Sequence, residues 1–208
     1  MDWQSEKVTS PVVILGEGRD EAELLSVLAR HLGLQVQCID CGGSQQFQVR
    51  LKVVVKAPGF RQVRSLGVVR DAEANAAGAA DSIRNCLRAE GLAVPKGPLQ
   101  RESADDGPDT AFLVVPLGET SGMMEDLILR TFEDQPSWRC QLAFFQCLKD
   151  RQIDVAGDNK KRRVQAGLAS LTSRHVARNI GDAAHMGLIP PDHQSLSELR
   201  DFLQLVAR

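Results

Sequence analysis

The feature that most constrains the fold is a short apolar run followed by an acidic turn and a helical pattern. Residues 12–15 form a continuous apolar run, which is typical of a strand that is covered on both faces. From residue 20 to residue 32 the apolar side chains recur at helical spacing, and Gly33 offers a stop. The segment therefore predicts a strand, a turn and a helix in succession.

The same alternation continues along the first two thirds of the 208-residue chain. Alternation of apolar and polar residues predicts a half-exposed strand at 34–39, and apolar runs predict further strands at 50–56, 66–71 and 111–117. One or two helical turns are expected at 60–65, and helical periodicity predicts a helix at 75–90. Residues 91–110 are rich in Pro, Gly and charge, and most of them are expected to form an exposed loop. From residue 122 onward the pattern favours helices alone, at 123–132, 138–148, 159–173 and 197–207.

Strands that alternate with helices favour a mostly parallel sheet. The sequence thus predicts an α/β fold with a sheet of about four strands flanked by helices. We expect residues 1–134 to form this α/β domain, and residues 135–208 to form a helical extension packed on the same core.

Composition excludes several classes of protein. The net charge of −2 gives no overall excess of positive charge for nucleic acid, so such binding would need a local basic patch. No apolar stretch approaches the roughly 20 residues that span a bilayer, and the polar start of the chain does not fit a signal peptide. Five cysteines without a secretion signal indicate reduced thiols, so we expect a cytoplasmic protein without a membrane partner.

The turn at 16–21 reads GEGRDE, and its acids conflict with a phosphate-binding role. A dinucleotide fingerprint needs a third glycine where Glu21 stands, and the Gly-Lys-Ser/Thr of a P-loop occurs nowhere in the chain. We expect the glycines to allow a tight bend that aims Glu17 off the end of the first strand. The turn is therefore interpreted as part of a metal site.

Acids follow three of the predicted strands, and the carboxyl ends of parallel strands meet at one edge of a sheet. They are Glu17, Asp20 and Glu21, then Asp71 and Glu73, then Glu119, Glu125 and Asp126. Clustered carboxylates stay ionised together only where cations neutralise them, and ligand sets made of oxygen alone suit Mg²⁺ or Mn²⁺. The alternative is local: several of these acids lie where they would stabilise the start of a helix.

These residues resemble the Toprim family, which is found in topoisomerases, bacterial primases and OLD-family nucleases. Glu17 matches the Toprim glutamate, Glu21 matches a second glutamate of OLD-type domains, and Asp71 with Glu73 matches the Asp-x-Asp motif. Three later segments also resemble small stand-alone Toprim-like proteins of unknown function: SGMMEDLIL, DNKKRRVQAGLAS and LRDFLQLV.

The resemblance implies a Mg²⁺-dependent phosphodiester hydrolase or nicking nuclease that acts on nucleic acid. Glu17, Asp71 and Glu73 would be catalytic and would hold one or two ions of Mg²⁺ or Mn²⁺, while Glu21 and Glu125 would complete or orient a second metal position. The chain departs from the family in having Asp-Ala-Glu for Asp-x-Asp and in lacking an ATPase module. These departures keep open a second interpretation, a non-catalytic Toprim-fold binding module in a phage-defence or toxin–antitoxin system. A separate ATPase or a defence protein would then be a partner.

Basic residues supply the local patches that nucleic acid would need. Six bases and no acid occur between residues 50 and 70, and a second basic cluster opens the predicted helix after residue 159. The residues expected to contact a phosphate backbone are Arg50, Lys52, Lys56, Arg61, Arg64, Lys160 and Lys161. A solvated face whose long side chains cover apolar surface is the alternative, and the oligomeric state is left open.

Overall fold

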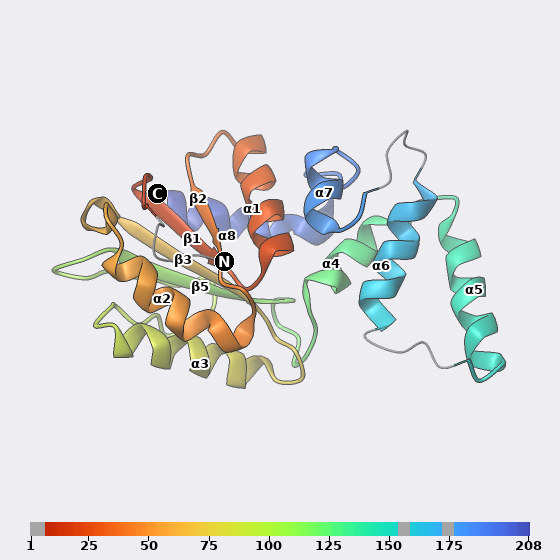
Figure 1. Ribbon diagram of the computed structural model, residues 1–208, viewed down its shortest axis with the longest axis horizontal. Coiled ribbons are helices and arrows are strands. Elements are labelled where there is room, and N and C mark those ends of the chain that lie inside the picture. The colour runs from red at the N-terminus through yellow and green to blue at the C-terminus, as the bar shows by residue number, and fades with distance from the viewer. Residues whose placement is uncertain (1–6, 154–158, 172–176) are drawn as a thin grey trace.

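A five-stranded sheet forms the centre of the molecule in the computed structural model, which describes residues 7–153, 159–171 and 177–208 (Figure 1). The strands are β1 (Val12–Gly16), β2 (Gln37–Asp40), β3 (Ser65–Asp71), β4 (Arg101–Glu102) and β5 (Asp109–Val115). Their order is β2-β1-β3-β5-β4, and every neighbouring pair is parallel except β4 and β5. The prediction of a mostly parallel sheet is confirmed, with one antiparallel edge strand added.

Helices connect and flank these strands. They are α1 (Arg19–His31), α2 (Phe47–Lys56), α3 (Ala76–Ala89), α4 (Met124–Thr131), α5 (Trp138–Asp150), α6 (Asn159–Ser170), α7 (Ile180–His185) and α8 (Ser197–Ala207). Short 3₁₀ turns occur at η2 (Ser44–Gln46), η3 (Phe60–Gln62) and η4 (Gln194–Leu196).

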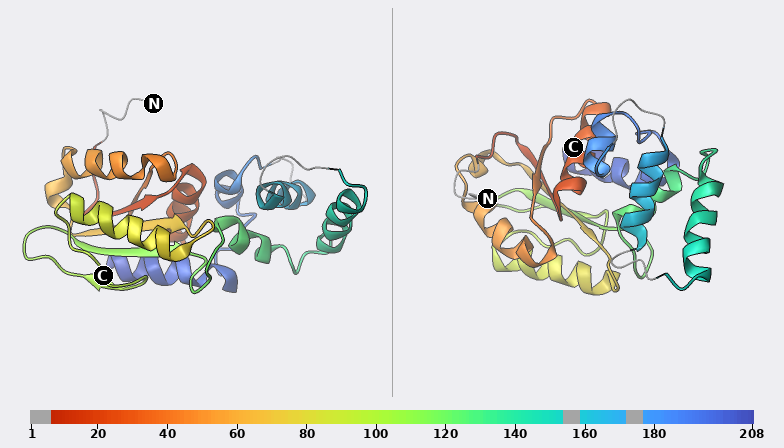
Figure 2. Two further views of the ribbon diagram at one scale, coloured as in Figure 1. Left: turned by 90° about the horizontal axis from the view of Figure 1, so that it is seen from below. Right: turned by 45° about the vertical axis from the view of Figure 1, so that its right-hand side comes forward.

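The strands are covered on both faces because alternate residues point to opposite sides. Ile14, Val69 and Leu113 belong to a core with residues of α1, α4 and α8. Val13 and Val68 belong to the other core, whose helical partners are α2 and α3. Figure 2 shows α2 and α3 on one side of the sheet and α8 on the other. The continuous apolar runs in the sequence follow from this double coverage.

A glycine on β3 sets how closely α8 approaches the sheet. A Cβ atom at Gly67 would lie 3.0 Å from both Ile14 Cγ1 and Phe202 Cζ, and 3.1 Å from Val206 Cγ2. The C-terminal helix therefore rests on the strand itself at this point. Core residues from both sides of residue 134 share one apolar cluster, and the domain division at that residue stays a prediction.

One predicted strand is wrong, because residues 50–56 lie in helix α2. The β-branched run favours a strand locally, yet Phe47, Leu51 and Val54 are buried at helical spacing against the sheet, while Val49 is exposed. Parallel strands also need a long crossover connection, usually a helix, and α2 supplies it between β2 and β3. Tertiary packing and topology thus override the local preference.

The remaining elements follow the sequence pattern with small differences. The helices expected at 20–32, 75–90, 123–132, 138–148 and 197–207 all form, and the turn expected at 60–65 is η3. The helix expected at 159–173 ends at Ser170, and residues 172–173 lie outside the described residues. Two short elements were not predicted, namely β4 within the expected loop and the six-residue helix α7. None of the helices in the described part of the chain is long and apolar enough to span a membrane.

Candidate metal centre

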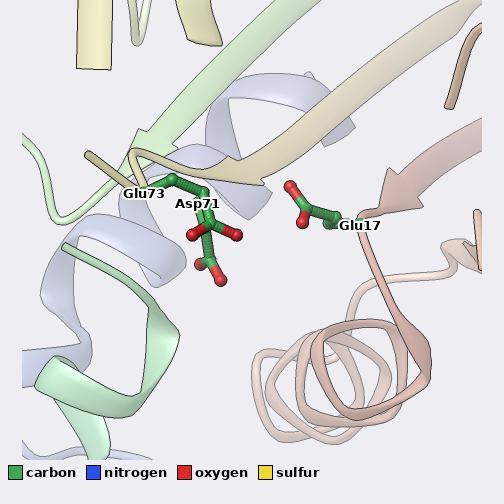
Figure 3. Close-up of side chains that lie close together, drawn as sticks. All are labelled: Glu17, Asp71 and Glu73. Atoms are coloured by element: carbon green, nitrogen blue, oxygen red, sulfur yellow. The ribbon is translucent and has the colours of Figure 1, made fainter. Parts of the chain in front are cut away.

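Three acids meet at the carboxyl ends of two neighbouring strands. Glu17 follows β1, Asp71 ends β3, and Glu73 lies two residues beyond it. One carboxylate oxygen of each lies within 4.8 Å of the others, and Figure 3 shows the three side chains pointing toward a common space. Because β1 and β3 are paired in parallel, residues 54 positions apart in sequence reach the same edge of the sheet.

The two glycines beside Glu17 allow close packing at the start of α1. A Cβ atom at Gly16 would lie 2.9 Å from the backbone nitrogen of Ala22, and one at Gly18 would lie 2.7 Å from a carboxylate oxygen of Glu21. Gly18 has a φ of −131°, which any residue can adopt, so the turn does not need glycine for its backbone conformation. The two glycines are needed instead because a side chain at either position would contact α1 too closely.

A buried arginine holds Glu17 in place. Arg70 donates its Nε–H to Glu17 Oε2 over 3.2 Å, and both side chains are almost fully buried. The guanidinium also donates to Ser82 Oγ and lies 5.3 Å from the centre of the Phe47 ring. Glu17 therefore has a buried positive charge as a partner and also lies close to the other two acids.

Asp71 is both a member of the acid group and a structural acceptor. Its Oδ1 accepts the backbone N–H of Met124 at 2.8 Å, at the first turn of α4. Burial, followed by the charge of Glu21 and smaller contributions from Glu17 and Glu125, raises the pKa of Asp71 to about 8. The negative charge of the ionised Asp71 carboxylate is thus poorly compensated by the protein alone.

Glu73 has an uncommon backbone conformation for a residue with a side chain. Its φ is 51°, in the left-handed region, and it is held there by two backbone hydrogen bonds with Gly122. The N–H of each residue donates to the carbonyl of the other, at 2.7 and 2.8 Å. Non-glycine residues in this region persist where the surroundings hold them, and they cluster at functional sites. This bridge brings Glu73 back toward Asp71.

The two other predicted metal ligands, Glu21 and Glu125, line a pocket that Glu17, Asp71 and Glu73 also line. Its volume is about 390 Å³, and its walls include Glu21 and Glu125 together with the three acids. Burial is the main cause that raises the pKa of Glu21 to about 7, with smaller contributions from Glu125, Asp20 and Glu17. Glu125 is buried on α4, and its Oε1 lies 3.9 Å from Lys161 Nζ. All five acids predicted as ligands are therefore brought to one place.

The other acids after β5 serve different contacts. Glu119 is exposed and pairs with Arg130 at 2.6 Å. Asp126 accepts the N–H of Met123 and pairs with Lys160 at 2.7 Å. Within the described residues, the third strand end thus adds Glu125 to the pocket without Glu119 or Asp126.

The predicted nucleic-acid residues fall into separate places. Lys161 lines the pocket, and Lys160 lies beside it on α6. Arg50 is buried and donates to the carbonyl of Asp40, and Arg64 precedes β3, about 20 Å of strand away from Asp71. Lys52, Lys56 and Arg61 are exposed. Lys161 of α6 therefore lines the acid pocket, Arg50 lies at the carboxyl end of the neighbouring strand β2, and Arg64 lies at the far end of β3.

Some residues in or next to the pocket were not predicted from the sequence. Arg70 was counted only as part of a basic run, although an arginine inside an apolar parallel strand needs a buried partner, and that is the signal that could have found it. Arg178 and Asn179 line the pocket just before α7. They precede a helix of only six residues, which is too short to show a clear periodicity, so no sequence pattern marks them.

The donor set fits a hard divalent cation. The clustered ligand atoms are all carboxylate oxygens, which are the ligands that Mg²⁺ and Mn²⁺ prefer. The raised pKa values of Asp71 and Glu21 report burial and mutual repulsion, both of which a bound cation would offset. Glu17, Asp71 and Glu73 are the residues that could hold it, with Glu21 and Glu125 next to them.

Comparison with known proteins gives a family and one similar solved structure. The C-terminal region of the OLD protein of Xanthomonas campestris pv. campestris superposes with a TM-score of 0.49 and 15% sequence identity, covering 95% of this chain and 92% of that one. No curated protein matches the sequence. A family model described as "Protein of unknown function (DUF3226)" matches residues 11–208. The chain therefore belongs to this DUF3226 family.

Proposed function

We propose that the chain is a Toprim-type, metal-dependent phosphodiester hydrolase or nicking nuclease that acts on nucleic acid. The observation that carries the proposal is the meeting of Glu17, Asp71 and Glu73 within 4.8 Å at adjacent strand ends. The motif spacing in the sequence supports it as well. When bound at such carboxylates, Mg²⁺ or Mn²⁺ supplies activation of water and stabilisation of the leaving oxygen.

The residues around the acids have separate parts in this proposal. Arg70 orients Glu17 so that Oε2 faces the guanidinium and the other oxygen is left for a cation. The bridge to Gly122 fixes the direction of Glu73, and the N–H of Met124 fixes Asp71. Lys161 on the wall of the pocket would contact a phosphate oxygen of the substrate.

The proposal also covers the contacts to the nucleic-acid backbone, the location of the protein and its partner. Lys160 and Lys161 of α6 would bind the phosphate backbone next to the acids, and the exposed bases of 52–64 would bind it further away. The five cysteines form no disulfide, which agrees with a reducing cytoplasm as the place of action. A separate ATPase would be the partner if the chain works as part of a larger nuclease.

A second candidate is a non-catalytic Toprim-fold binding module of a phage-defence or toxin–antitoxin system. It is favoured by one specific observation: two of the three acids already have protein partners, Glu17 with Arg70 and Asp71 with the N–H of Met124. Acids with such contacts could persist for structural reasons after catalysis is lost. The longer side chain of Glu73 in place of aspartate points the same way.

The test is a cleavage assay with purified protein on single- and double-stranded DNA and RNA, with Mg²⁺, Mn²⁺ or a chelator. The proposal expects cleavage that needs the metal and that is lost in Glu17→Gln and in Asp71→Asn. Glu119→Gln is the matched control, because Glu119 is an exposed acid outside the pocket. Full activity in either pocket variant would contradict the assignment. No cleavage by the intact protein, together with weak metal binding, would favour the binding module.

A further inference from the structure

Part of the wall of the acid pocket is formed by residues 178–180, where the chain enters α7. Helix α7 packs against α1, and Figure 1 shows the two side by side. Asp20 Oδ1, at the start of α1, accepts the N–H of Gly181 at 3.4 Å, and a Cβ atom at Gly181 would lie 2.9 Å from Glu23 Cβ. The close contact at Gly181 holds this part of the wall against α1.

Two reciprocal hydrogen bonds fix the backbone of Arg178. Asn179 Oδ1 accepts the N–H of Asp182 at 2.7 Å, and Asp182 Oδ2 accepts the N–H of Arg178 at 3.3 Å. Such bonds between a helix cap and the first turn set the direction in which the chain enters the helix. The long side chain of Arg178 therefore extends from a defined position on the pocket wall.

The guanidinium of Arg178 differs in its contacts from the other bases of the pocket. Arg19 pairs with Glu23 at 2.7 Å, and Lys161 Nζ lies 3.9 Å from Glu125 Oε1. Arg178 is exposed, and within the part of the chain that the structure describes it makes no ion pair, although six carboxylates line the same pocket. A guanidinium placed in this way is suited to an anion that enters from outside.

We propose that Arg178 binds the phosphate next to the scissile one, so that the pocket prefers a nucleic-acid strand to a substrate with a single phosphodiester. The inference rests on the function proposed for the acid pocket. A cation on the acids would take the scissile phosphate, which leaves the guanidinium for a neighbouring phosphate of the same strand. Its planar N–H groups match two phosphate oxygens at once. Arg178 is thus a substrate-binding residue that takes no part in breaking the bond.

Cleavage kinetics of Arg178→Gln in the full chain test the proposal. With Mn²⁺ and a single-stranded oligonucleotide of DNA or RNA, the variant is expected to raise KM about tenfold and to keep kcat within about twofold, because the contact persists from the bound substrate to the transition state. A dinucleoside monophosphate has no neighbouring phosphate, so both proteins should cleave it with the same kcat/KM. Arg178→Lys should restore part of the affinity for the oligonucleotide.

The control is Arg88→Gln, at an exposed arginine of α3 outside the pocket, and it should behave like the wild type. Equal melting temperature and equal Mn²⁺ affinity in Arg178→Gln and the wild type would show that the substitution leaves the fold and the acids intact. An unchanged KM for the oligonucleotide in Arg178→Gln would overturn the proposal. An equal rise in KM for the dinucleoside monophosphate would overturn it as well.

A binding measurement separates the role of Arg178 from the proposed cleavage. Fluorescence anisotropy with labelled single- and double-stranded DNA and RNA in Mn²⁺ reports affinity whether or not the protein cuts. Arg178→Gln is expected to weaken binding about tenfold and to reduce the slope of log K against log salt by about 0.7 to 0.9, as for one lost phosphate contact. These changes without cleavage by the wild type would refute the hydrolase and keep the role of Arg178. Cleavage by the wild type with unchanged binding in the variant would refute that role alone, and a wild type that binds none of the probes would refute it too.

Discussion

Arg70 and Glu17 form a buried ion pair between adjacent strand ends, with Nε 3.2 Å from Oε2. Arg70 lies next to Asp71 on β3, but its side chain reaches the opposite face of the sheet, where it contacts Phe47 and Ser82. The pair therefore connects the acid group to the core formed by α2 and α3. It also leaves Glu17 with a charge partner when no cation is bound.

Removal of this arginine should destabilise the fold. Arg70→Ala is expected to lower the free energy of unfolding by about 3 kcal/mol, because it leaves the Glu17 carboxylate buried without its partner. Urea denaturation measures the change. Arg88→Ala, at an exposed arginine of α3, is the control and should change the free energy by less than about 0.5 kcal/mol. Equal stability of the two variants would show that Arg70 does not compensate Glu17.

The stability of the metal-free protein should fall as pH rises. Burial and neighbouring acids raise the folded-state pKa of Asp71 from 3.8 to about 8 and that of Glu21 from 4.5 to about 7. The folded protein therefore holds more protons than the unfolded chain between about pH 4 and pH 8, and stability is lost across that window. Urea denaturation in the presence of a chelator at several pH values measures the slope.

Two further observations check the origin of this pH dependence. Asp71→Asn keeps an acceptor for the N–H of Met124 but removes the titrating group, so it should flatten the slope. Mg²⁺ should stabilise the wild type more at about pH 8 than at about pH 5, because protons compete with the cation for the same oxygens. A slope that is unchanged in Asp71→Asn would assign the pH dependence to other groups.

Replacement of Glu73 by glycine is expected to destabilise the fold less than replacement by alanine. Both substitutions remove the carboxylate, but at a φ of 51° alanine retains the steric penalty of a Cβ atom, and glycine does not. Glu73→Gly is expected to be more stable than Glu73→Ala by about 1 kcal/mol in thermal or urea unfolding. Both variants should lose affinity for Mn²⁺ to a similar degree. If alanine were the more stable of the two, the left-handed backbone would not be a source of strain.

The sequence predicts the sheet and the meeting of acids because both depend on local patterns. Apolar runs mark β1, β3 and β5, and acids that follow parallel strands reach one edge whatever the details of packing. Helix α2 could not be predicted in this way, since its valine run favours a strand until Phe47, Leu51 and Val54 pack together on the sheet.

Other parts of the site depend on contacts between residues that are distant in the chain. Asp71 accepts from Met124, 53 positions later, and Arg70 reaches back 53 positions to Glu17. The left-handed backbone of Glu73 results from its bridge to Gly122, and nothing in the local sequence requires it. The basic run of 50–64 was expected to contact a phosphate backbone because it holds bases and no acid, but the fold divides it: Arg50 lies at the carboxyl end of β2, and Arg64 lies at the opposite end of β3 from Asp71.

The central claim is that Glu17, Asp71 and Glu73 form a site for a divalent cation, and a calorimetric titration of Mn²⁺ into the metal-free protein tests it most directly. The wild type and the control Glu119→Gln should bind Mn²⁺ with the same affinity, and Glu17→Gln should bind it at least about tenfold more weakly. Binding that is undetectable in the wild type, or unchanged in Glu17→Gln, would contradict the claim.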